Sequence, residues 1–188
     1  MPVPADSKTG LAAVTEAATA EGARGLPPVH LWHPAHCGDI DIVIRRDGTW
    51  LHENSPIGRA ELVRLFSTVL RKDPDGYCLV TPVEKLSIRV EDLPFRAVAV
   101  TAENGKLRFI TDVGDAVEAG PDHPIRVETD PVTGEPAPAL QVRADLWARI
   151  SRPVFYELVE RAEVEDGRLA VRSGGAVFPL GPVGAGVA

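Results

Sequence analysis

Three short turn signals set the strongest constraint on how this chain can fold. The dipeptides Asp47-Gly48, Asn104-Gly105 and Asp166-Gly167 each stand between two segments with strand-like composition. Asp-Gly and Asn-Gly favour tight turns between antiparallel strands, because these residues tolerate a left-handed backbone. The sequence therefore predicts several β-hairpins spread over most of its length.

Helical patterns interrupt the strands at a few places. Over residues 59–72 the apolar side chains recur at the spacing of one helix face, with Ser55 as the N-cap and Pro56 in the first turn. Residues 153–162 form a second predicted helix, and the alanine-rich segment 11–23 a short third one. The stripe of the first helix consists of Leu62, Leu65, Phe66, Val69 and Leu70.

Landmarks recur in the same order in the two halves of the chain. Trp50 precedes Glu61-Leu62-Val63 and Asp75-Gly76, and Trp147 precedes Glu157-Leu158-Val159 and Asp166-Gly167 at a nearly constant offset. This indicates a duplicated strand–helix–strand unit, although short echoes also arise by chance. We expect an α+β fold of two small repeated modules, the second mostly antiparallel β with one helix. The expected boundaries are an N-terminal extension over 1–25, modules over 26–93 and 94–182, and a tail over 183–188.

Composition excludes several classes of protein. The chain has 188 residues, 44% of them hydrophobic, and no apolar run of the ~18 residues needed to cross a membrane. The net charge is −7 and neither half is positive, which disfavours bulk binding to duplex DNA. Two cysteines do not make a disulfide framework, and we expect the N-terminal segment not to be a secretory signal, because it lacks a basic region followed by a continuous apolar core. We expect a cytoplasmic protein with reduced thiols and no cofactor.

Histidines and acids offer few catalytic patterns. His30, His33, His36 and Cys37 resemble a metal cluster, but Pro34 breaks the segment and no second Cys/His pair completes a tetrahedral set. A polar connector explains this segment better.

An enzyme would have to use other groups. Asp39 and Asp41 share one face of a strand, and paired carboxylates could bind a cation or share a proton. A solvent-facing strand explains the pair better. His52-Glu53 lacks the second histidine of HExxH, and no glycine-rich phosphate loop occurs.

Cationic and polar residues are densest in the second part of the first module. Arginines can hold a phosphate or carboxylate by bidentate hydrogen bonds. We expect arginines of both modules to converge on an anionic ligand in a cleft between them; the simpler alternative is solubility and pairing with nearby acids. The predicted ligand-binding residues are Arg59, Arg71, Thr81, Glu84, Lys85, Arg143 and Arg149.

A long set of residues between positions 32 and 95 forms a recognisable pattern. Its members are Trp32, Pro34, 37–41, Trp50, 55–57, Arg59, 65–66, 69–71, Asp73, 75–76, 79–85, Asp92 and 94–95. This pattern resembles the uncharacterised bacterial domain-of-unknown-function family 1285, and the likeness extends over residues 26–180. The resemblance implies two repeated modules, a C-terminal half similar to pleckstrin-homology-type folds, and a ligand site between the modules for a nucleotide or nucleic-acid-derived molecule. It implies no catalytic residue and does not include the four histidines 30, 33, 36 and 52.

These observations favour a non-catalytic module that binds an anionic small molecule or takes part in signalling. The alternatives are an adaptor that binds a protein partner and a metal-dependent hydrolase built on Asp39, Asp41 and His52. No set of nucleophile, base and orienting residue supports the hydrolase.

Overall fold

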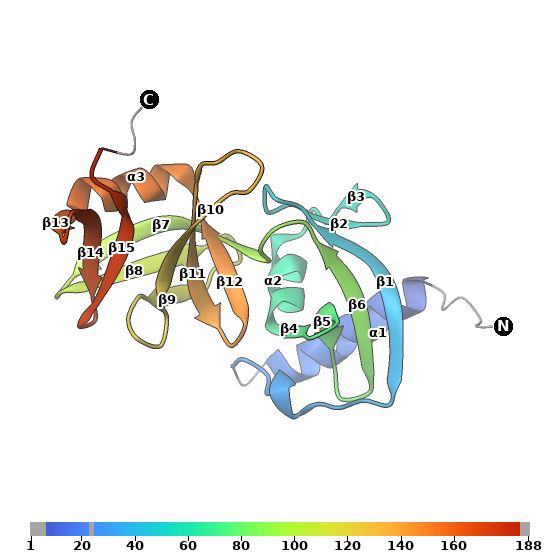
Figure 1. Cartoon of the computed structure of the whole chain (residues 1–188). Helices are drawn as coiled ribbons and strands as arrows, with labels where there is room; N and C mark the ends of the chain where they lie inside the picture. The colour runs from blue at the N-terminus through green and yellow to red at the C-terminus, as the bar shows by residue number, and fades with distance from the viewer. Residues whose placement is uncertain (1–6, 23–24, 185–188) are drawn as a thin grey trace. The chain divides into compact units, whose positions relative to one another are not determined.

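Two six-stranded sheets organise the chain, one before and one after the boundary between Asp92 and Leu93 (Figure 1). The structure, a computed structural model, describes residues 7–22 and 25–184. Over these residues it contains three α-helices and fifteen strands, which makes both units strand-rich α+β. None of the described helices is long and apolar enough to cross a membrane.

The sheet of the first unit has the strand order β3-β2-β1-β6-β5-β4. Strand β1 pairs antiparallel with β2 and parallel with β6, and the predicted Asp47-Gly48 turn joins β1 to β2. The strands are β1 (His36–Ile44), β2 (Trp50–His52), β3 (Ser55–Pro56), β4 (Leu70–Asp73), β5 (Gly76–Val80) and β6 (Glu84–Val90).

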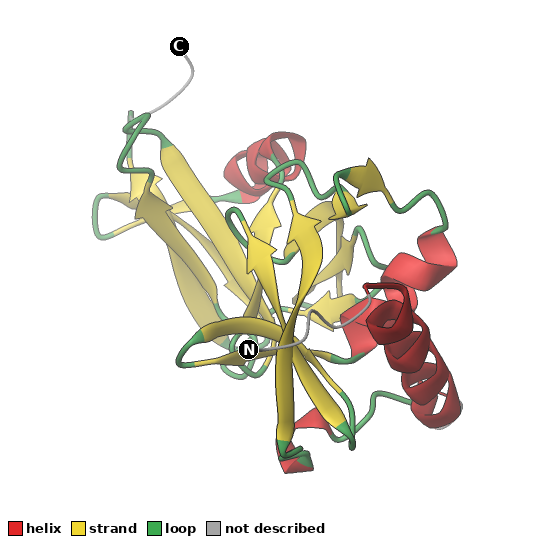
Figure 2. Cartoon of the chain, turned by 90° about the vertical axis from the view of Figure 1, so that its right-hand side faces the viewer, coloured by secondary structure: helices red, strands yellow, loops and turns green. Residues whose placement is uncertain are grey.

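Helices α1 (Ser7–Gly22) and α2 (Ala60–Thr68) contact one another, and α1 also contacts β1 (Figure 2). Their apolar side chains, among them Val14 and Phe66, are buried in the same unit as Ile42 and Ile44 of β1. Buried and exposed positions alternate along β1, so its isoleucines all point to the same face and pack in this core. A short 3-10 helix, η1 (Val29–Leu31), lies between α1 and β1 in the chain.

Two predictions around α2 were wrong. The helix ends at Thr68 rather than residue 72, because the Val80 N–H donates to the Val69 carbonyl and the next four residues pair with β5 as strand β4. Ser55 does not cap the helix, because Ser55 and Pro56 pair with β2 as strand β3. The N-cap is Arg59, whose side chain makes no capping hydrogen bond.

The second unit combines a six-stranded sheet of order β10-β11-β12-β7-β8-β9 with a three-stranded sheet, β13-β14-β15. Helix α3 (Arg152–Arg161) contacts β7 and β14, one strand from each sheet, and confirms the predicted helix to within one residue. The strands are β7 (Phe95–Glu103), β8 (Lys106–Thr111), β9 (Ala116–Glu118), β10 (Ile125–Thr129), β11 (Pro136–Arg143), β12 (Leu146–Ile150), β13 (Glu163–Glu165), β14 (Arg168–Ser173) and β15 (Ala176–Pro182).

The order strand, helix, then antiparallel strands recurs in the two units. Helix α2 is followed by β4, β5 and β6, and α3 is followed by β13, β14 and β15. The three strands after α2 belong to the main sheet, whereas those after α3 form the separate sheet. The fold is therefore two strand-rich modules in succession, and the likeness of the second to a pleckstrin-homology fold stays a prediction.

Candidate functional site

Five of the seven predicted ligand-binding residues belong to the first unit and two to the second. Arg71 and Lys85 lie on β4 and β6, Thr81 and Glu84 lie at the connection between β5 and β6, and Arg59 precedes α2. In the second unit, Arg143 ends β11 and Arg149 lies on β12.

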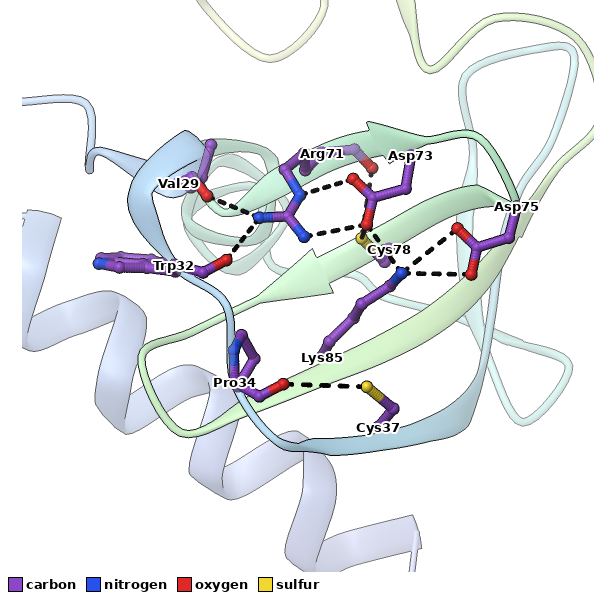
Figure 3. A network of polar contacts seen from close by, with 9 residues as sticks. All are labelled: Val29, Trp32, Pro34, Cys37, Arg71, Asp73, Asp75, Cys78 and Lys85. Carbon is purple, nitrogen blue, oxygen red and sulfur yellow. Dashed lines mark hydrogen bonds and ion pairs between the residues drawn. The ribbon is translucent and has the colours of Figure 1, made fainter.

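The structure brings Arg71 and Lys85 together through one carboxylate (Figure 3). Arg71 donates from Nε to Asp73 Oδ1 at 2.7 Å and from Nη2 to Oδ2 at 2.9 Å. Lys85 Nζ lies 2.7 Å from the same Oδ2 and 3.2 Å from Oδ2 of Asp75. The two cations are thus matched by two acids.

Arg71 also fixes a segment that is distant in sequence. Its Nη1 donates to the carbonyl oxygens of Val29 and Trp32, each at 2.8 Å (Figure 3). These two carbonyls lie in and just after η1, so one guanidinium attaches this segment to β4. Four of the five N–H donors of Arg71 are used on protein acceptors.

The network shifts the pKa values of its members. The hydrogen bond from Arg71, followed by that from Lys85, lowers the pKa of Asp73 to about 2 despite partial burial. The same hydrogen bonds to Asp73 raise the pKa of both Arg71 and Lys85. Burial, with a smaller effect of the Asp73 charge, raises the pKa of the Cys78 thiol to about 11, so this thiol stays protonated and unreactive at neutral pH. The cluster is a charge-balanced support of the fold.

Thr81 has a local structural role. Its hydroxyl is buried, accepts from the N–H groups of Val83 and Glu84, and donates to the Glu84 carbonyl. These bonds shape the turn between β5 and β6. Glu84 carries a buried Oε1 with no hydrogen-bond partner among the described residues.

The two arginines of the second unit contact their own unit. Arg143 lies 2.6 Å from Asp115 and stacks over Phe95, with its guanidinium carbon 5.0 Å from the ring centre. Arg149 donates to the carbonyls of Ala137 and Pro138. The convergence of these arginines with those of the first unit stays a prediction, and the candidate site described below lies within the first unit alone.

A groove of about 570 Å³ lies where α1, α2 and β2 meet, and Arg59 lines it. Its volume falls within the range of small-molecule sites, roughly 300–1,000 Å³. The Arg59 side chain is exposed and makes no hydrogen bond or ion pair with any described residue. The other lining residues are Leu11, Ala12, Thr15, Glu16, His52, Ile57, Gly58 and Leu62.

The groove adds two residues of α1 that the sequence pattern did not single out, and it includes His52, which the sequence offered only as a residue of a hydrolase. Thr15 and Glu16 come from α1, whose alanine-rich sequence indicated only a helix. His52 contributes from β2, and its Nε2 is buried without a hydrogen-bond partner among the described residues, as is Nε1 of Trp50 on the same strand face.

No metal centre forms from the candidate ligands considered in the sequence, among the side chains described over residues 10–20 and 25–184. No group of three or more His, Cys, Asp or Glu side chains converges there. His30, His33, His36 and Cys37 are all exposed, and Cys37 Sγ lies 4.0 Å from the Pro34 carbonyl. Asp41 pairs with Arg89 at 3.0 Å.

Comparisons with known proteins agree on one family. The model of "Domain of unknown function (DUF1285), N-terminal domain" matches residues 27–93, and that of "Protein of unknown function (DUF1285), C-terminal domain" matches residues 94–180. The crystal structure of a DUF1285 family protein from Silicibacter pomeroyi DSS-3 is 49% identical, with a TM-score of 0.83 over 90% of this chain and 95% of that one. A DUF1285 family protein from Shewanella baltica OS155 is 25% identical, with a TM-score of 0.52 over 63% of this chain and 90% of that one. No curated protein matches the chain.

Proposed function

The chain belongs to the DUF1285 family, and we propose that it is a non-catalytic module whose first unit binds an anionic small molecule. The proposed site is the groove between α1, α2 and β2. The observation that carries the proposal is that Arg59 lines this groove while its guanidinium has no partner among the described residues.

The position of Arg59 at the start of α2 is a second reason to expect an anion beside it. It is the N-cap of α2, a helix of nine residues, and the first amides of a helix have no partner within the helix. The helix dipole adds a partial positive charge at this end. A phosphate or carboxylate held by Arg59 would therefore lie beside favourable backbone groups. Arg71, Arg143 and Arg149, by contrast, already bond to protein acceptors.

The remainder of the groove suits a ligand with an apolar body. Leu11, Ile57 and Leu62 line it with aliphatic surface, and Thr15 and His52 add polar atoms. Binding sites for cofactors and metabolites combine such surface with a few placed polar groups. A nucleoside monophosphate combines these features, because its flat base can contact the apolar surface and its phosphate is anionic. We take this class as the proposed ligand.

Replacing Arg59 with glutamine should weaken nucleotide binding by roughly 10- to 50-fold, because a hydrogen bond to a charged group contributes about 1.5–3 kcal/mol when desolvated and less when exposed. The measurement is isothermal titration calorimetry of the full chain with GMP, AMP, CMP and UMP, and with inorganic phosphate. The matched control is Arg64→Gln. Arg64 is an exposed arginine of α2 that does not line the groove.

The control should bind each nucleotide within about twofold of the unmodified protein, since it changes the net charge equally but leaves the groove intact. Equal affinities of the Arg59→Gln variant and the unmodified protein would contradict the proposal. So would the absence of binding by every anion of the panel.

A further inference from the structure

The two helices that border the groove present opposite charges to it. Arg59 lies at the start of α2, and Glu16 lies on α1. Both side chains are exposed, and no ion pair joins them. Glu16 likewise has no hydrogen bond or ion pair with the side chains described over residues 10–20 and 25–184.

The helix itself gives Glu16 no electrostatic role. A glutamate stabilises a helix when a cation lies three or four residues away. The residues at these positions are Ala12, Ala13, Thr19 and Ala20, none of which is charged. Glu16 also lies in the third turn of α1 rather than in its first turn, where an acid would favour the helix dipole. The carboxylate is therefore unexplained by the stability of α1.

A carboxylate opposes the binding of an anion in the same groove. Like charges within a Debye length, about 8 Å at physiological ionic strength, repel one another. The repulsion is avoided when the part of the ligand beside Glu16 carries N–H donors instead of a negative charge. An ionised carboxylate only accepts hydrogen bonds, so N–H groups are its matching partners. Such a hydrogen bond is stronger than one between neutral groups.

We propose that the ligand carries an amino group in addition to its anion, and that Glu16 selects for this amino group while Arg59 holds the anionic end. The inference rests on the proposed function. Among nucleotides, it favours those whose base bears an exocyclic amino group. Glu16 is on this account a specificity-determining residue, and Arg59 supplies the affinity common to all anions.

Two nucleotide pairs test this selection, because the members of each pair differ in one amino group. GMP differs from IMP by its 2-amino group, and AMP differs from purine riboside 5′-monophosphate by its 6-amino group. Calorimetry on the full chain should show that the aminated member of at least one pair binds five- to tenfold more tightly. Glu16→Ala should abolish that preference, because it removes a hydrogen bond that only the aminated member makes, whereas the lost repulsion of the phosphate affects both members of a pair equally. Glu61→Ala, an equal charge change at an exposed position of α2 outside the groove, should leave the preference intact.

The outcomes separate this inference from the proposed function. If nucleotides bind and Arg59→Gln weakens them, but neither pair shows a preference, the selection by Glu16 is wrong and the anion site stands. A preference that persists in Glu16→Ala overturns the inference in the same way. If no nucleotide binds, both the site and the selection are wrong.

Discussion

Replacing Asp73 with alanine should lower the free energy of unfolding of the first unit by about 2–3 kcal/mol. The carboxylate is the shared acceptor of Arg71 and Lys85, so its loss leaves two partly buried cations without their principal partner. Removing one member of a fully buried ion pair costs about 3–5 kcal/mol. The side chains of Asp73 and Lys85 are 18% and 17% exposed, so partial contact with solvent reduces this cost. Native-state hydrogen exchange of the β4, β5 and β6 amides measures this unit separately.

The control is Asp75→Ala. The Asp75 side chain is 68% exposed, and it contacts only Lys85 within the network. Surface ion pairs contribute about 0–1 kcal/mol, so the control should change the exchange of these amides little. If both variants have the same small effect, the network does not stabilise the unit in the way described.

The Asp73 variant should also change the dependence of stability on pH. The folded pKa of Asp73 is about 2, below its usual value of 3.8. A lowered folded pKa contributes stability that is fully present above the usual pKa and is lost as the pH falls toward the folded pKa. The difference in stability between the unmodified protein and Asp73→Ala should therefore shrink between about pH 4 and pH 2. A difference that stays constant over this window would contradict the lowered pKa.

Replacing Ser173 with alanine should destabilise the second unit by about 2–3 kcal/mol. Its hydroxyl is completely buried, accepts from the Leu107 N–H at 2.8 Å and donates to the Ala119 carbonyl at 2.6 Å. These bonds connect β14 of the three-stranded sheet to the six-stranded sheet. Alanine leaves two buried backbone groups unpaired, each at a cost of about 1–3 kcal/mol, part of which relaxation recovers.

Urea unfolding with hydrogen exchange of β8 and β14 amides measures this loss. Ser151→Ala is the control, because Ser151 is buried in the same unit and its hydroxyl bonds to no described residue. It should change the stability by less than about 0.5 kcal/mol. Equal losses in the two variants would contradict the bridging role of the Ser173 hydroxyl.

Local signals predicted the hairpins because turn chemistry is local. Asn104 and Gly105 both have positive φ, at 52° and 73°, a geometry that asparagine tolerates and that glycine adopts freely because it has no Cβ atom. The predicted helix over 59–72 is too long, because its C-terminal end is determined by contacts that are distant in sequence. Leu70 continues the apolar stripe of α2, but strand pairing between Leu70 and Leu79 determines its structure, and that pairing is not visible in helical periodicity.

The roles of the predicted site residues were less accessible to sequence reasoning. Arg71 was recognised as a polar residue of interest, but its acceptors Val29 and Trp32 lie about forty residues earlier and are backbone carbonyls, which leave no side-chain signal. Glu16 was missed because an exposed glutamate on an alanine-rich helix is unremarkable in a sequence. Only the packing of α1 near α2 places it in the same groove as Arg59.

The most direct test of the anion site is a map of backbone amide shifts in ¹H–¹⁵N spectra of the full chain during titration with GMP. The account predicts that the largest changes occur over residues 11–16 and 57–62, which surround the groove. Changes confined to the Arg71 and Lys85 network, or to the second unit, would contradict it.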